Sequence, residues 1–174
     1  MQFIKNNIRL RKINFDDTDL IIKWRNSKSV KENLFAQENL TVEQHAMWMK
    51  NNIETNKCFQ FIIEIKDSNT PIGTTFIKNI DKLNNKGEFG IFIGENNNRG
   101  HGYGTIATHL TLDFGFNELK LNRIYLSVIN VNKSAIKCYE NAGFKIDGIM
   151  REDYKREESY YDIVVMSILK NDYM

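Results

Sequence analysis

The sequence predicts an α+β fold in which a mixed, mostly antiparallel sheet of about seven strands carries helices on both faces. Three strand-like runs, residues 59–66, 72–80 and 88–94, follow one another across short turns, which favours an antiparallel meander. A helix-like run over residues 105–117 then leads to another strand over residues 123–129. Such a crossover makes the strands on either side of it parallel neighbours, so the sheet is mixed.

The N-terminal part of the chain is expected to begin with a strand followed by helices. Residues 8–13 alternate apolar and basic side chains, as a half-buried strand does. Asp16 or Asp17 is placed to cap a helix that runs to about Asn26, and a second short helix is expected over residues 29–34.

A third helix is predicted from a capping box. Thr41 and Gln44 have the spacing of that motif, and the helical pattern continues to about Glu54. The inward face of this helix is expected to carry His45, Trp48, Met49 and Ile53.

The C-terminal part is expected to contain two helices and a closing hairpin. A helix over residues 132–141 ends at Gly143, which suits a left-handed cap. Residues 144–153 and 160–169 then form the last two strands. The helix over residues 105–117 and its first turn bury Tyr103, Ile106, Ala107, Leu110 and Phe114.

Composition restricts the class of protein. The 174 residues are expected to form one domain, residues 1–174, and 41% hydrophobic with 26% charged residues is typical of a soluble protein. The net charge of +2 gives no case for a nucleic-acid surface. No apolar run approaches the roughly 20 residues of a membrane span, and no signal-peptide core opens the chain. A cytoplasmic protein without nucleic-acid or membrane partners is therefore expected.

Cysteine and histidine usage predicts neither a disulfide framework nor a metal site. Cys58 and Cys138 are the two cysteines, and Cys138 is expected to be a small packing residue. His45, His101 and His109 are scattered along the chain, with no cysteine beside them.

A glycine-rich loop lies between the strand over residues 88–94 and the helix that follows. Gly100, Gly102 and Gly104 alternate behind Arg99, so little keeps a ligand away from the backbone amides. The amides at a helix start lack internal partners and attract anions, so a phosphate or pyrophosphate is expected here. The alternative is a tight turn that binds nothing.

Two familiar phosphate-binding loops do not fit. A P-loop needs Gly-Lys-Ser/Thr, and Gly104-Thr105 lacks the lysine. Residues 102–107 satisfy the Rossmann pattern G-x-G-x-x-A, but the next strand runs into Asn130 where an acidic residue is expected.

Two motifs that cover roughly residues 86–145 resemble those of the GNAT superfamily, the acetyl-CoA-dependent N-acetyltransferases. The first motif reads Arg99-x-x-Gly102-x-Gly104. The second reads Asn132-x-x-Ala135-x-x-x-Tyr139-x-x-x-Gly143-Phe144. The resemblance implies the GNAT fold, whose central parallel strands splay apart at the cofactor. It also implies acetyl-CoA as co-substrate and no metal.

The resemblance further implies which residues contact acetyl-CoA. The pyrophosphate is expected on the glycine loop, and the pantetheine arm along the strand before it. The expected cofactor residues are Ile91, Phe92, Ile93, Arg99, Gly100, His101, Gly102, Tyr103, Gly104, Thr105, Asn132 and Lys137.

Three residues are candidates for catalysis. The family's general acid is a tyrosine at the position of Tyr139, and a phenol is protonated at neutral pH; the alternative is that Tyr139 only packs. Glu88 is the candidate base, acting through a water, unless it is a solvated charge at a strand end. His45 is the rival base. Asn132 is expected to cap its helix and to lie near the cofactor or the acceptor amine.

The acceptor is predicted from a looser pattern on the early helices. Trp24-Arg25-Asn26 followed by His45-x-x-Trp48 resembles bacterial N-acetyltransferases that act on 4-amino-4,6-dideoxy sugars carried by UDP, as in pseudaminic acid synthesis. These five residues are therefore expected to bind the acceptor, since aromatic rings suit a sugar or uracil and Arg25 suits a phosphate. Alternatively, both tryptophans are core residues and Arg25 pairs with a carboxylate.

Other acceptors stay open. Related GNAT branches acetylate polyamines or the N-terminal amine of ribosomal proteins, and a non-catalytic domain that binds acetyl-CoA is a further interpretation. A polyamine needs several acids facing the cleft, whereas Glu88, Glu157, Glu158 and Asp162 are not clustered in the sequence. In every catalytic interpretation the partner is a small-molecule or peptide amine, and a homodimer is possible.

Overall fold

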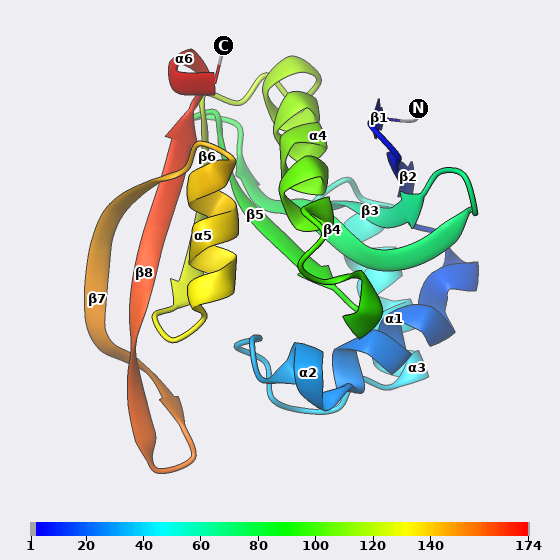
Figure 1. Ribbon diagram of the computed structural model, residues 1–174, viewed down its shortest axis with the longest axis horizontal. Coiled ribbons are helices and arrows are strands. Elements are labelled where there is room, and N and C mark those ends of the chain that lie inside the picture. Colours follow the sequence, from blue (N-terminus) through cyan, green and yellow to red (C-terminus); the bar gives the residue numbers. More distant parts are fainter. Residues whose placement is uncertain (1–2, 174) are drawn as a thin grey trace.

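The computed structural model describes residues 3–173, and its strands form one eight-stranded sheet (Figure 1). The strands are β1 (Phe3–Lys5), β2 (Ile8–Lys12), β3 (Phe59–Ile65), β4 (Thr70–Asp81), β5 (Lys86–Ile93), β6 (Arg123–Ile129), β7 (Lys145–Arg156) and β8 (Ser159–Leu169). The helices are α1 (Thr18–Asn26), α2 (Lys28–Lys31), α3 (Val42–Trp48), α4 (Tyr103–Asn117), α5 (Lys133–Asn141) and α6 (Lys170–Tyr173). The sheet order is β1-β2-β3-β4-β5-β6-β8-β7. This confirms the predicted mixed α+β sheet, with one strand more than expected.

The additional strand is β1. It forms a hairpin with β2 in which Phe3 pairs with Leu10, and Asn6 turns the chain with a positive φ of 52°. A strand of three residues is too short to show an alternating pattern, which is why the sequence did not reveal it.

Asp17, one of the two residues expected to cap α1, is its N-cap residue, but its side chain makes no capping hydrogen bond. Asn14 caps a short 3₁₀ turn in front of α1. The carboxylate of Asp17 instead accepts two hydrogen bonds from the guanidinium of Arg11, at 2.7 and 2.8 Å. The predicted capping box between Thr41 and Gln44 is confirmed at the start of α3.

Helices cover both faces of the sheet because neighbouring residues on a strand point to opposite sides. Phe61 of β3 belongs to the main core, which packs against α4 and α5. Its neighbour Ile62 belongs to a smaller core with Trp24 of α1 and Met49, which follows α3. We call these the α4 face and the α1 face. No helix within residues 3–173 is long and apolar enough to cross a membrane.

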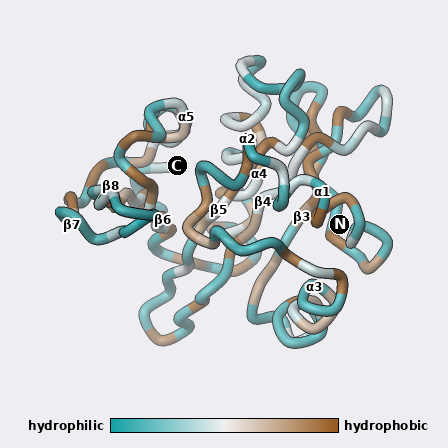
Figure 2. The backbone as a smooth tube through the Cα atoms, turned by 90° about the horizontal axis from the view of Figure 1, so that it is seen from below, coloured by the Kyte–Doolittle hydropathy of each residue, from teal (hydrophilic) through white to brown (hydrophobic). Residues whose placement is uncertain are grey.

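The parallel strands β5 and β6 pair only at their N-terminal ends. Lys86, Gly87 and Glu88 face Arg123, Ile124 and Tyr125, and the remaining residues of both strands are not paired with each other. Figure 2 accordingly shows β6, β7, β8 and α5 gathered on one side and β3, β4, α1 and α3 on the other. The predicted splay of the central parallel pair is confirmed, and it leaves a gap beyond Glu88.

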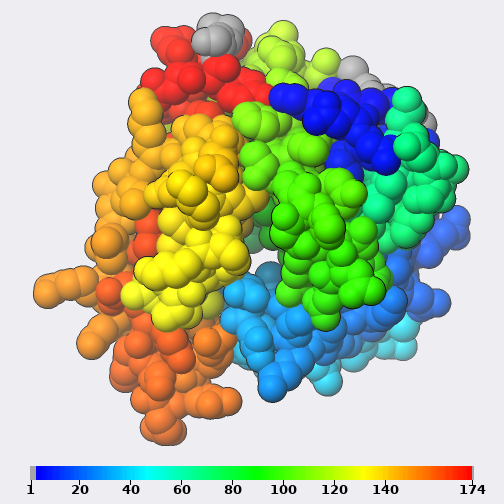
Figure 3. Space-filling view, in the orientation of Figure 1, coloured from blue at the N-terminus to red at the C-terminus, as the bar shows by residue number. Residues whose placement is uncertain are grey.

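The β7–β8 hairpin reaches across to the loop between α2 and α3. The Tyr154 hydroxyl donates to the carbonyl oxygen of Phe35 at 3.1 Å, and Arg156 donates to that of Glu32 at 2.6 Å. Figure 3 shows the surface hollowed between α4 and α5, with the α2 segment and the end of this hairpin below the hollow.

Candidate active site

The glycine loop presents open backbone at the start of α4. Gly100 and Gly102 have φ angles of 80° and 79°, and a Cβ atom at either position would meet nothing within 4 Å. Gly102 is the N-cap of α4, and its carbonyl accepts the first helical hydrogen bond, from the amide of Ile106. The amides of residues 103–105 precede that bond, so they are free for an anion. The loop therefore fits a pyrophosphate.

Arg99 fastens this loop to the end of β5. Its guanidinium donates to the carbonyl oxygen of Ile93 at 2.8 and 3.1 Å and to that of Ser29 at 3.3 Å. The exposed ring of His101 stacks on Tyr103, with 5.7 Å between centroids, and Tyr103 packs against the main core. Thr105 lies inside the first turn of α4, 3.4 Å from the Cys138 sulfur.

The unpaired edge of β5 borders the gap. The amide of Gly94 donates to Ile72 on β4, so by alternation the backbone groups of Ile91 and Ile93 point away from β4 and toward β6. The backbone of Phe92 points to β4 instead, and its ring packs edge-on against Trp24 on the α1 face. Of the three residues expected along the pantetheine arm, Ile91 thus offers both of its backbone groups, whereas Ile93 offers only its amide because Arg99 occupies its carbonyl oxygen.

Tyr139 lies on the α4 face beside the gap. Its side chain is 8% exposed, and its ring packs edge-on against Phe89 of β5 at 6.0 Å. No described residue forms a hydrogen bond with its hydroxyl. Burial raises the pKa of Tyr139, so the phenol keeps its proton at neutral pH. The ring of Tyr139 therefore packs in the core, and its hydroxyl carries the proton that a general acid must donate.

Glu88 lies on the opposite face of the sheet from Tyr139. Phe89 faces Tyr139, so Glu88, its neighbour on β5, points to the α1 face. Its carboxylate lies 3.2 Å from the Lys78 ammonium and accepts a hydrogen bond from Asn79 at 2.7 Å. Candidate base and candidate acid thus flank the gap from its two sides.

The two remaining predicted residues of α5 have local roles. The side-chain oxygen of Asn132 accepts from the amide of Ala135 and from the hydroxyl of Ser134, both at 3.1 Å, so Asn132 caps α5 as expected. Lys137 is 71% exposed and pairs with Glu140 at 3.7 Å.

Sequence reasoning missed an aromatic floor on the α1 face. Phe76 lies over Gly90, where a Cβ atom would collide with its ring. Tyr125 is the register partner of Glu88 on β6, at the last paired position before the gap. We call Phe76, Tyr125 and Glu88 the acceptor floor. The signal for it was Gly90 inside a strand, a position where glycine often admits a close neighbour.

Two of the predicted acceptor residues make contacts within the protein. Trp24 is 1% exposed, and its indole N–H donates to Glu95 at 2.7 Å, so it has no free face for a sugar or uracil. Asn26 exchanges two hydrogen bonds with the backbone of Leu40 and holds the loop before α3. Both side chains therefore connect α1 to neighbouring segments, Trp24 to Glu95 after β5 and Asn26 to Leu40 before α3.

His45 is buried and Arg25 is half-buried, and each has a buried nitrogen without a partner. His45 is 3% exposed, and its Nδ1 lies 3.1 Å from the Thr18 hydroxyl, while its ring stacks on Trp48. His45 Nε2 and Arg25 Nε are buried and have no hydrogen-bond partner among residues 3–173. Burial lowers the pKa of Arg25; burial, and secondly the Arg25 charge, lower the pKa of His45. The described residues offer Arg25 no carboxylate.

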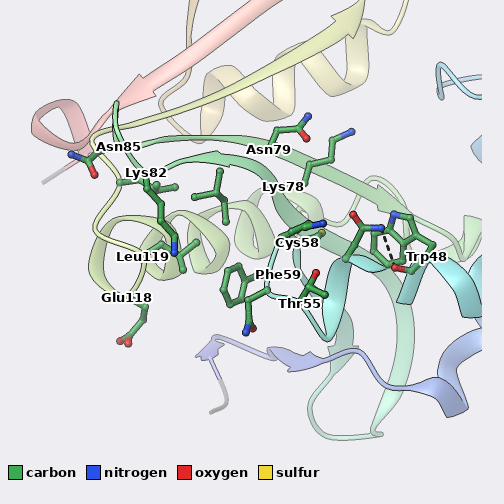
Figure 4. A pocket seen from close by; sticks show the side chains of 15 residues that line it. Trp48, Thr55, Cys58, Phe59, Lys78, Asn79, Lys82, Asn85, Glu118 and Leu119 are labelled. Atoms are coloured by element: carbon green, nitrogen blue, oxygen red, sulfur yellow. Dashed lines mark hydrogen bonds between the residues drawn. The ribbon is translucent and has the colours of Figure 1, made fainter. Parts of the chain in front are cut away.

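A cavity of about 780 Å³ lies away from the glycine loop (Figure 4). It runs from Trp48, Lys78 and Asn79 to Glu118 and Leu119 at the end of α4. Lys78 and Asn79 therefore touch both this cavity and Glu88. Across residues 3–173, no cluster of three or more His, Cys, Asp or Glu could hold a metal ion.

Comparison with known proteins gives consistent matches. A family described as "Acetyltransferase (GNAT) domain" matches residues 7–145. The chain is 25% identical over 171 residues to a spermidine N(1)-acetyltransferase of Vibrio cholerae, covering 98% of each chain. It is 27% identical over 169 residues to an uncharacterized N-acetyltransferase, p20, of Bacillus licheniformis, covering 95% and 94%.

Solved structures agree with this result. The crystal structure of the Vibrio cholerae spermidine N-acetyltransferase in complex with CoA and spermine has a TM-score of 0.91 at 25% identity, over 97% of this chain and 99% of that one. A dodecameric structure of the Vibrio cholerae enzyme matches with a TM-score of 0.84 at 25% identity, over 98% of each chain.

Proposed function

The chain belongs to the GNAT acetyltransferase family and is an acetyl-CoA-dependent N-acetyltransferase, and we propose that its acceptor is a polyamine. The observation that carries this proposal is the full-length likeness to a spermidine N-acetyltransferase whose structure holds CoA and spermine. The acceptor floor supports it as a surface that attracts cations: the Lys78 ammonium pairs with Glu88 and lies 5.7 Å from the centre of the Phe76 ring, and the Arg123 guanidinium lies over Tyr125. An acceptor ammonium would take the place of these side chains. An amino-sugar nucleotide, the acceptor expected from the sequence, finds no support among these relatives.

The roles of the residues follow from their positions. Acetyl-CoA supplies an activated acetyl group when it is bound, and the glycine loop with the free edge of β5 is suited to hold it. We assign Glu88 the task of taking a proton from the acceptor ammonium on the α1 face. Tyr139 holds a proton on the α4 face and is the donor there. The two proton transfers are thus kept on opposite sides of the sheet.

One observation favours a second candidate acceptor, an amino sugar linked to a nucleotide. Arg25 is half-buried and lacks a carboxylate among the described residues, and such a guanidinium suits a phosphate. A polycation gains nothing from this residue.

Turnover with three acceptors tests the proposal. We expect kcat/KM for spermidine to exceed that for a UDP-linked 4-amino sugar and for an N-terminal ribosomal-protein peptide. A higher value for the sugar nucleotide would replace the polyamine by the second candidate. Glu88→Gln should lower kcat by about 10² or more, because an amine in its ammonium form cannot attack. Glu118→Gln, at the exposed end of α4, is the matched control.

We also propose that the chain forms oligomers. A dodecameric structure of the Vibrio cholerae relative supports assembly in general. The homodimer expected from the sequence is one such assembly.

A further inference from the structure

Asn130 carries a polar atom that nothing in the described structure explains. Its side-chain oxygen is buried and has no hydrogen-bond partner among residues 3–173. Its backbone amide donates to the carbonyl oxygen of Asp162 at 2.9 Å, which continues the β6–β8 pairing by one residue. The main chain here is therefore fixed by the sheet, while the side-chain oxygen of Asn130, a hydrogen-bond acceptor, has no donor. Buried polar atoms without partners often mark the place of a ligand.

The sheet register places Asn130 at the mouth of the gap. Glu88 and Tyr125 are the last paired residues of β5 and β6, and Ile93 and Asn130 each lie five positions further along. Because the strands are parallel, both residues lie at the same end of the gap, Ile93 on the β5 side and Asn130 on the β6 side. The glycine loop follows Ile93, and α5 follows Asn130.

Asn130 comes directly after β6, in the turn that leads to α5. Leu126 and Val128, which precede it on β6, belong to the main core and lie on the α4 face. This is the face that carries α4, whose N-terminus ends the glycine loop. An acetyl-CoA molecule with its pyrophosphate on the loop and its arm entering the gap would lie close to this turn.

We propose that the Asn130 carboxamide oxygen accepts a hydrogen bond from an amide N–H of the pantetheine arm. The chemistry fits, because the arm contains secondary amides, each with one donor, and β5 on the other side of the gap offers the backbone groups of Ile91 and the amide of Ile93. Asn130 is thus a positioning residue that binds the pantetheine arm of acetyl-CoA and does not contact its nucleotide. The inference rests on the proposed path of acetyl-CoA through the gap.

Calorimetry with two ligands tests this assignment. Acetyl-CoA contains the arm, whereas adenosine 3′,5′-bisphosphate contains only the nucleotide end. Asn130→Ala should weaken acetyl-CoA binding by about fivefold to tenfold and leave the bisphosphate within about twofold, since one hydrogen bond to a neutral group is lost. Asn141→Ala, an exposed asparagine at the end of α5, should change neither affinity.

The ratio of the two affinities makes the result decisive. Asn130→Asp keeps an acceptor oxygen, and any repulsion of phosphates affects both ligands, so its ratio should stay near that of the wild type. An unchanged ratio in Asn130→Ala, or equal weakening of both ligands, would overturn the inference. If Asn130→Ala does not fold, Asn130→Leu supplies the same comparison. If the wild type binds the bisphosphate but not acetyl-CoA, the proposed function itself fails.

Discussion

Tyr139 serves the core and the reaction with different parts of one side chain. The ring packs against Phe89 and Phe144, whereas the hydroxyl makes no hydrogen bond to any described residue. Removing the hydroxyl alone therefore separates the two roles. We expect Tyr139→Phe to fold normally and to bind acetyl-CoA as before, while kcat falls by about 10² to 10⁴. Tyr160→Phe, at an exposed tyrosine, is the control, and a wild-type kcat in Tyr139→Phe would leave packing as its only role.

His45 makes stability depend on pH. Burial, and secondly Arg25, lower its pKa in the folded state, while Asp17 acts weakly in the other direction. Between its ordinary value near 6.5 and the lowered value, the unfolded chain binds more protons, so stability falls as pH falls. From about pH 7.5 to about pH 5.5, His45→Gln should therefore lose less unfolding free energy than the wild type. Urea denaturation measures this, with His101→Gln as control; equal losses in both variants would refute it.

At the scale of elements, the glycine loop needs glycine at Gly102 because of its backbone conformation and not because a side chain would lack room. Gly102 has a φ of 79° with open room around it, so a valine there is strained without a steric clash. We expect Gly102→Val to weaken acetyl-CoA binding at least about tenfold, because the N-terminal turn of α4 must shift. Gly148→Val is a matched control, since Gly148 also has open space but no positive φ. Unchanged calorimetric affinity in a folded Gly102→Val would show that the loop does not hold the pyrophosphate.

Elements that repeat a local pattern were the ones that the sequence could predict. The α3 capping box and the cap of α5 follow from residues a few positions apart, and the β5–α4–β6 crossover follows from the order of strand and helix patterns. Contacts between distant residues could not be read in this way. The Asp17 carboxylate binds Arg11 and not the first amides of α1, and Phe76 lies over Gly90, because sheet register and tertiary packing decided both. The aromatic pattern that suggested a sugar site included Trp24, whose burial only the three-dimensional packing reveals.

At the scale of the whole molecule, β7 is an uncovered edge of the sheet. Ile146, Ile149 and Met150 are 52%, 58% and 41% exposed along it. An apolar edge strand offers both side chains and unpaired backbone groups to another copy of the chain. We expect an oligomer by light scattering, and Ile149→Lys should reduce its mass. Leu83→Lys changes an equally apolar but isolated residue, 90% exposed in a turn, and should not alter the mass. A monomeric wild type would exclude this role for β7.

The bonds from the β7–β8 hairpin to the α2–α3 loop also bear on how the protein matures during synthesis. Tyr154 and Phe35 are 119 positions apart, and Arg156 and Glu32 are 124 apart. A ribosome builds the chain from its N-terminus, so β5, the glycine loop and α4 emerge well before this hairpin. The closure between the β7–β8 hairpin and the α2–α3 loop therefore waits for nearly the last residues translated. A truncated or stalled nascent chain would thus lack both of these bonds, and its α2–α3 loop would be free of the hairpin.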